Sequence, residues 1–329
     1  MNFKAFRDSP LSNPIINALV SAVNAQSKWQ TLLSLRTPND VLTDLLTIEE
    51  LYYHSFHKGS CPDFEKVLRS YYSTQRVSDT SKEYQTLQEC TLYAKHRISQ
   101  NQVLTAADLL KINEVLTTLN AAQLADENIP YHILINDIWT ILLDLYNPCK
   151  SCPVLLEIII AVCRLLTLPP VLKINLWTLY VLLETMYPEI FKNTRLSLQW
   201  LLLVNPEEPL ADYEPERLVL LLLEVFKNMW EDMYNTHFDL IDKEKDIQNI
   251  ICGFSPSLQT DRVLSVLTSN ICLSNKSFGE KAKVSHGTSV NYLKELERIG
   301  VLYSVMDGRE RLYFNKAFCK FASKRLGVT

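Results

Sequence analysis

KVSHGTSVNYLKELERIGVLYSVMDGRERLYF, residues 283–314, is the stretch that decides the fold of the C-terminal region. Within it, Thr288–Ile299 has its leucines at helical spacing, and the following Gly300 suits the left-handed end of a helix. Two alternating apolar runs then surround Asp307-Gly308, a dipeptide that favours a tight turn between antiparallel strands. The stretch therefore predicts a helix followed by a β-hairpin.

Two shorter helices are predicted just before this stretch, at Leu258–Cys272 and Ser277–Val284. Helix, short helix, turn, helix and hairpin follow one another in the order of a winged helix-turn-helix. The sequence therefore predicts such a domain over residues 255–329. In this fold the last helix presents the residues of its N-terminal end to a major groove of DNA.

The charge of the tail favours an anionic partner. Residues 270–329 hold 11 Lys and Arg against 5 Asp and Glu, whereas the whole chain has a net charge of −4. Asparagine can pair with adenine, and lysine suits guanine or phosphate. Double-stranded DNA is the expected partner, and a homodimer is the second. The predicted DNA contacts are His286, Thr288, Asn291 and Lys294 on the helix, with Arg309 and Arg311 on the wing.

The rest of the chain is predicted to be helical. Residues 60–252 contain no glycine, which excludes a phosphate-binding loop or a dinucleotide fingerprint there, because both need backbone turns with positive φ. We expect an N-terminal helical region over residues 1–100 and a helical core over residues 101–250. Thr105 is expected to cap a helix that runs to Leu116. The predicted fold class is mainly α, with one β-hairpin.

The apolar run Pro153–Leu168 is predicted to be a buried central helix, because it is too short and too charged to span a bilayer. Eight cysteines lack regular spacing, and Cys149–Cys152 is a single CxxC without a second pair. No signal peptide opens the chain. We therefore expect reduced thiols, a cytoplasmic protein, and no metal, cofactor or membrane association.

The order of these parts resembles that of bacterial Fic-family proteins, the protein adenylyltransferases, which often end in a winged helix. Residues 283–302 resemble the winged helix of that family. Ile129-Pro130, followed by a helix that ends at Tyr146-Asn147, is similar to the helix after the family's target-binding flap. Residues 152–167 resemble the helix that leads into the family's catalytic loop. The resemblance implies an all-helical Fic-like core.

The catalytic loop of that family reads H-P-F-x-x-G-N-G-R-x-x-R, and residues 169–180 stand in its place. Only Pro170 and Asn175 match. Pro169 replaces the general-base histidine and cannot take a proton. Lys173 replaces the acidic magnesium ligand, while Trp177 and Tyr180 replace the phosphate-binding arginines. The resemblance therefore implies a core without adenylyltransferase activity.

Two further departures agree with this loss. Only Thr117–Asn128 remains where the family's target-binding flap would lie. The family's inhibitory motif, S-x-x-x-E-G, would fall near His54–Ser60, where Lys58 takes the place of the glutamate. An inactive core needs neither a flap nor an inhibitor.

The leading hypothesis is a non-enzymatic, Fic-like regulator that binds DNA through its winged helix. Two alternatives remain open. One is a Fic-like enzyme with a different chemistry. The other is a helical protein-interaction module similar in outline to PCI domains, in which the winged helix contacts neighbouring chains.

Overall fold

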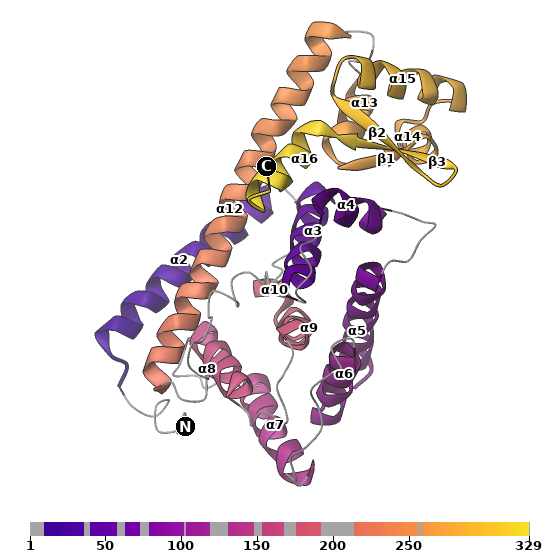
Figure 1. Ribbon diagram of the computed structural model, residues 1–329. Helices are drawn as coiled ribbons and strands as arrows, with labels where there is room; N and C mark the ends of the chain where they lie inside the picture. Colours follow the sequence, from indigo (N-terminus) through magenta and orange to yellow (C-terminus); the bar gives the residue numbers. More distant parts are fainter. Residues whose placement is uncertain are drawn as a thin grey trace. The chain divides into compact units, whose positions relative to one another are not determined.

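The chain is mainly helical (Figure 1). The computed structural model describes residues 10–35, 40–57, 63–72, 79–101, 103–118, 131–147, 153–167, 176–191, 214–255, 258 and 260–328. Its described strands form a single three-stranded antiparallel sheet near the C-terminus. The predicted fold class, mainly α with one β-hairpin, is confirmed.

The chain divides into two compact units. The first comprises residues 1–31 and 82–232, and the second comprises residues 32–81 and 233–329. Each unit combines an N-terminal segment with a later one, and each is described by itself below.

Helices alone make up the described part of the first unit. α6 packs against α7 and α9, and α7 packs against α8. α12 belongs to both units, because it continues past residue 232 to Phe254. The elements are α2 (Asn13–Leu35), α5 (Asp79–Asn101), α6 (Ala106–Thr118), α7 (Tyr131–Tyr146), α8 (Val154–Leu166), α9 (Leu176–Met186), α10 (Pro188–Phe191) and the first half of α12 (Pro215–Phe254).

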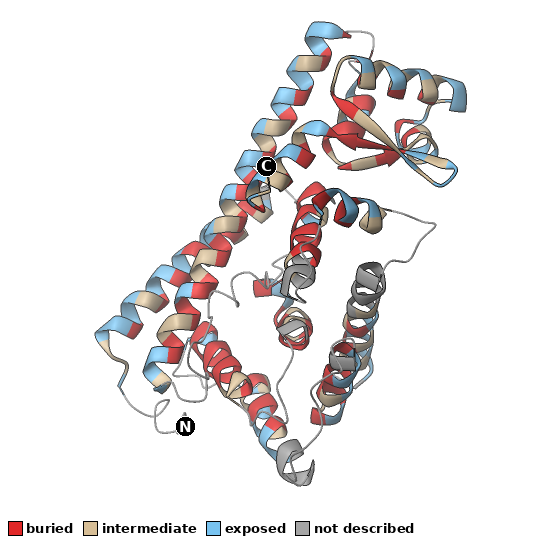
Figure 2. Cartoon of the chain, viewed as in Figure 1, coloured by how far each residue is buried: buried red, intermediate tan, exposed pale blue. Residues whose placement is uncertain are grey.

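The core of the first unit is built around α8, which is buried over most of its length (Figure 2). This confirms the predicted buried central helix. An aromatic cluster adds to this core, with the Phe226 and Trp230 rings stacked at a centroid distance of 5.8 Å and the Phe191 ring 5.7 Å from Phe226. Burial of such large side chains is the main stabilising contribution in a helical unit.

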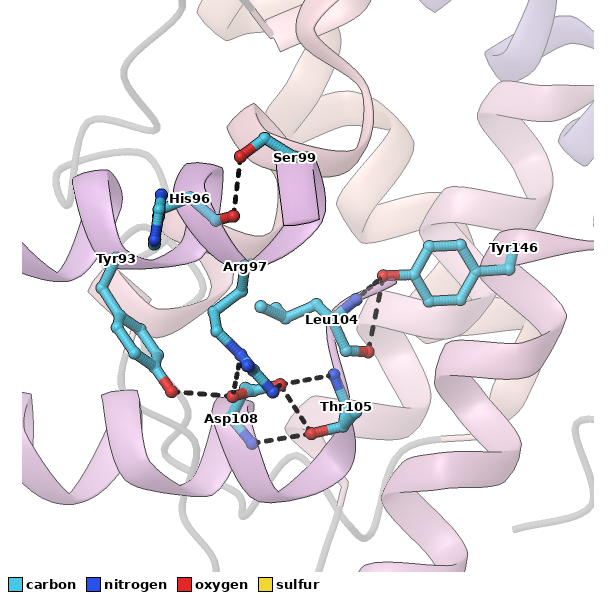
Figure 3. Close-up of polar contacts among 8 residues, drawn as sticks. All are labelled: Tyr93, His96, Arg97, Ser99, Leu104, Thr105, Asp108 and Tyr146. Atoms are coloured by element: carbon cyan, nitrogen blue, oxygen red, sulfur yellow. Dashed lines mark hydrogen bonds and ion pairs between the residues drawn. The ribbon is translucent and has the colours of Figure 1, made fainter. Parts of the chain in front are cut away.

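A polar cluster around the carboxylate of Asp108 joins α5 to the start of α6 (Figure 3). The carboxylate accepts hydrogen bonds from the Tyr93 hydroxyl at 2.7 Å, from Arg97 Nε at 2.9 Å and from the Thr105 hydroxyl at 2.6 Å. The backbone N–H of Asp108 in turn donates to Thr105 Oγ1 at 3.2 Å. Thr105 therefore caps α6 as predicted, and Asp108 completes a reciprocal capping box.

The second unit holds two N-terminal helices, the second half of α12 and the winged helix. Its sheet has the order β1-β3-β2, and all neighbouring strands are antiparallel. The elements are α3 (Asp40–His57), α4 (Phe64–Tyr72), α13 (Asp261–Thr268), β1 (Cys272–Ser274), α14 (Asn275–Ala282), α15 (His286–Arg298), β2 (Leu302–Asp307), β3 (Glu310–Asn315) and α16 (Lys316–Arg325).

The predicted winged helix-turn-helix pattern is present, with three corrections of detail. The helix predicted to reach residue 272 ends at Thr268, and Cys272 pairs with Phe314 in the sheet, a long-range contact that local periodicity does not reveal. The hairpin turn lies one residue later than predicted, because Asp307 pairs with Glu310 and only Gly308, with φ of 61°, has the positive φ of the turn. Residues 316–325 form α16, which was not predicted.

The winged helix has a core of its own. Phe278, Leu293, Leu296, Phe314 and Phe318 are each at most 1% exposed. They come from α14, α15, β3 and α16, and Leu293 and Leu296 form the inward face of α15, while Ile299 is half-buried. Among the helices of the described residues, none is both long enough and apolar enough to cross a bilayer.

Candidate nucleic-acid interface

Helix α15 is held in place by contacts on its inner side. Its N-cap is Ser285, whose hydroxyl accepts from the backbone N–H of Thr288 at 3.3 Å. The hydroxyl of the fully buried Ser289 lies 2.8 Å from the backbone oxygen of Asn275 and 2.6 Å from its Oδ1. These bonds fix α15 against α14 at the turn of the motif. The opposite face of the helix is therefore directed to solvent (Figure 2).

The four predicted contacts on α15 differ in how available they are. His286, Asn291 and Lys294 are exposed. Thr288 is half-buried, and its hydroxyl lies 2.9 Å from the hydroxyl of Ser285, so it takes part in the helix cap. Three of the four side chains can thus reach a ligand directly, while Thr288 mainly shapes the N-terminus of the helix.

The wing carries the other two predicted contacts. Arg309 lies in the turn between β2 and β3, and Arg311 lies on β3 opposite Met306, which is 54% exposed. Both arginines are exposed. In the described part of the chain neither arginine forms an ion pair, and the same holds for Lys294. These cations therefore keep their charge available for an external anion.

Two acidic side chains near α15 are engaged within the protein. Glu295 accepts from Arg298 Nη2 at 2.7 Å and from the Ser255 hydroxyl at 2.8 Å. These hydrogen bonds, chiefly those from Arg298, lower the pKa of Glu295 to about 2. Glu297 accepts from the Ser304 hydroxyl at 2.6 Å. Arg298 therefore partly balances the negative charge of Glu295, whereas the neutral hydroxyl of Ser304 leaves Glu297 charged.

Sequence reasoning missed Lys283 as a candidate contact. Lys283 ends α14 in the left-handed conformation, with φ of 55°, and its exposed side chain precedes the α15 cap by two residues. A second missed cation, Lys276, is exposed in the first turn of α14. The excess of lysine in the tail was the available signal, but it did not show which lysines flank α15.

Residues 169–180 lie mostly outside the described part of the chain. Pro169, Pro170, Lys173 and Asn175 fall outside it, and for Trp177 only the helical backbone is described. Tyr180 lies half-buried on α9. Two residues earlier on α9, the buried Thr178 hydroxyl donates to Asn113 Oδ1 at 3.1 Å, a contact that ties α9 to α6. Among the described residues, no group of three or more His, Cys, Asp and Glu side chains could hold a metal ion.

Comparison with known protein families and with curated proteins finds no match to this chain. The candidate interface therefore rests on its own geometry and charge.

Proposed function

We propose that this protein is a DNA-binding regulator, and that its winged helix is the part that binds double-stranded DNA. The observation that carries the proposal is the pairing of a well-anchored α15 with exposed polar and cationic side chains on its outer face and on the wing. Asn291 and Lys294 suit base edges or phosphates, and Arg309 and Arg311 suit the backbone or a groove beside the recognition helix.

The electrostatics support the same proposal. Most of the affinity of DNA-binding proteins comes from cations that neutralise phosphates and release counterions. The candidate cations lack internal ion pairs in the described part of the chain, whereas Glu295 is bound by Arg298 at 2.7 Å. The net field around α15 thus favours a polyanion.

The test is fluorescence anisotropy of the intact protein on a labelled pool of random-sequence duplexes, at low and at moderate salt. We expect binding that weakens steeply with salt. The double variant Lys294→Ala, Arg309→Ala should lower the affinity. It should also reduce the slope of log affinity against log salt concentration by the amount expected for the loss of about two phosphate contacts.

A charge-matched control separates a local contact from the net charge of the protein. Lys28→Ala, Lys245→Ala removes two exposed lysines outside residues 261–328. We expect this variant to bind like the unmodified protein. Absence of binding at low salt, or equal losses in both double variants, would contradict DNA binding through the winged helix. The winged helix would then be better explained as a protein-contact surface.

We further propose that the helical body is a Fic-like scaffold without adenylyltransferase activity. Support comes from the substitutions at Pro169, Lys173 and Trp177 in the loop and from the resemblance of the surrounding helices. Isothermal titration with ATP should give no binding heat, and a hydroxyl-bearing target protein should gain no adenylyl group. Transfer from ATP that depends on Lys173 or Asn175 would overturn this part.

A further inference from the structure

A second surface lies between the C-terminal half of α12 and α16, both in the second unit (Figure 1). These helices, with Gly300 and Val301 just before β2, line an open groove with a volume of about 790 Å³. None of the residues proposed to contact DNA lines it. The groove is therefore a separate feature of the molecule, and the proposed function does not account for it.

The floor of the groove is apolar. Ile247 is 1% exposed and Val301 is 3% exposed, so both are fixed parts of the core. Ile250, Ala317 and Phe321 also line the groove and are half-buried. Half-buried apolar groups in a groove can gain further burial from a ligand that covers them.

The two rims of the groove carry opposite charges. On α12, Asp239, Asp242 and Asp246 are spaced so that they share one side of the helix. All three carboxylates are exposed. Lys243 of α12 also lines the groove and pairs with Asp246 at 3.0 Å, and Lys245 pairs with Asp242 at 2.9 Å.

On α16 the rim is formed by Lys316, Lys320 and Lys324, which recur every four residues and are all exposed. In the described part of the chain no ion pair joins these lysines to the acidic rim or to any other carboxylate. The α12 rim is thus acidic on balance, with three aspartates and one lysine, the α16 rim is basic, and no ion pair joins the two rims in the described part of the chain.

We propose that this groove binds an amphipathic helix of a partner protein. The apolar stripe of that helix would cover the floor, its cationic side would lie along α12, and its anionic side would lie along α16. A helix is about 10–12 Å wide with its side chains, so the groove volume corresponds to roughly two helical turns. A nucleic acid would place phosphates beside the three aspartates as well as beside the lysines, whereas a helix with one cationic and one anionic side matches both rims.

The probe is a labelled 18-residue helical peptide with an apolar stripe, lysines along one side and glutamates along the other. A control peptide has the same composition, but lysine and glutamate alternate on both sides of the stripe. Fluorescence anisotropy with the full-length protein should show saturable binding of the first peptide and binding at least roughly tenfold weaker for the second.

Protein variants locate the contact. Lys320→Glu, Lys324→Glu makes both rims acidic and should weaken binding of the first peptide by about tenfold or more. The matched control, Lys28→Glu, Lys66→Glu, reverses two exposed lysines outside the groove and should leave binding unchanged. Ala317→Phe fills the floor without changing any charge and should also weaken binding.

Circular dichroism shows whether each variant is folded. If Lys320→Glu, Lys324→Glu does not fold, the peptide affinity of Ala317→Phe tests the groove instead. The proposal is overturned if the first peptide fails to bind up to millimolar concentration. It is equally overturned if both peptides bind alike, or if the groove variants bind as the control does.

Discussion

Arg325 in α16 forms a two-point ion pair with Glu49 in α3, with Nε facing one carboxylate oxygen and Nη2 lying 3.1 Å from the other. The Arg325 side chain is 19% exposed and that of Glu49 only 2%. Arg325 also donates to the hydroxyl of Thr236 in α12. The Arg325 side chain thus joins α16, the last helix of the winged-helix domain, to α3 and α12, which are distant in sequence.

Removing Arg325 should destabilise the second unit strongly. Arg325→Ala removes the two-point contact to the buried Glu49 carboxylate, and removal of one partner of a buried ion pair typically costs about 3–5 kcal/mol of unfolding free energy. Urea unfolding followed by circular dichroism measures this loss. Arg69→Ala is the matched control, because Arg69 forms an exposed pair with Glu65 at 2.7 Å within α4 and should cost less than about 1 kcal/mol. Similar losses for both variants would contradict the role given to Arg325.

Because of the Asp108 cluster, the first unit should lose stability as the pH falls. Burial raises the pKa of Asp108, but hydrogen bonds from Thr105, Tyr93 and Arg97 outweigh it and bring the pKa to about 2. The folded state therefore holds the ionised form more strongly than the unfolded chain, whose pKa is near 3.9. The stabilisation, roughly 2–3 kcal/mol, is complete above pH 5 and is lost as the pH falls from about 4 to about 2.

Asp108→Asn tests this dependence. The variant should be less stable than the unmodified protein at pH 7, and the difference between the two should shrink towards pH 2. Unfolding by urea at a series of pH values, with tryptophan fluorescence or circular dichroism as the signal, provides the measurement. A difference that stays constant across this range would show that the charge of Asp108 does not stabilise the fold.

Lys283 should be replaceable by glycine with a gain in stability. Its φ of 55° is left-handed, a conformation that costs a residue with a side chain about 1–2 kcal/mol and glycine almost nothing. Glycine makes the unfolded chain more flexible, which offsets part of the gain, so Lys283→Gly should stabilise by about 0.5–1 kcal/mol. Gly300→Ala is the converse test, because Gly300 has φ of 83° and alanine there should destabilise. A loss of stability in Lys283→Gly would argue against the geometry described for this turn.

The cysteine thiols should differ widely in reactivity. Among the described cysteines, Cys252 is exposed, whereas Cys90, Cys163 and Cys319 are buried. Burial also raises the pKa of the Cys90 thiol to about 11 and that of Cys319 to about 12, which lowers the fraction of reactive thiolate. Alkylation of the native protein, followed by peptide mass spectrometry, should label Cys252 well before these three. Rapid labelling of Cys163 in the folded protein would contradict its burial.

Local patterns in the sequence were sufficient for much of the secondary structure. The apolar run of α8 predicts a buried helix, and Thr105 followed by Asp108 carries the signal for the α6 cap. Glycine at 300 and 308 marks the end of α15 and the turn of the wing. These features succeed because each depends on residues within a few positions of one another, where spacing and backbone preference act directly.

The candidate interface could be predicted in the same way only in part. The inward leucines of α15 fix its outer face, so the exposure of Asn291 and Lys294 followed from periodicity. Periodicity did not predict two other features: the Thr288 hydroxyl lies at the Ser285 cap, and Glu295 accepts a hydrogen bond from Ser255. The Glu295–Ser255 contact joins residues 40 positions apart, and local spacing in the sequence cannot predict a contact over that separation.

By itself, the sequence determined that the chain is mainly helical, that its tail is basic, and that a hairpin follows a polar-faced helix. Only the tertiary structure decided that Cys272 belongs to a strand, because that strand exists through its pairing with β3. Only the tertiary structure brought Arg325 to Glu49, and set the aspartates of α12 opposite the lysines of α16. Local periodicity specifies which face of an element is buried, whereas the partner that buries it is chosen by packing across the whole chain.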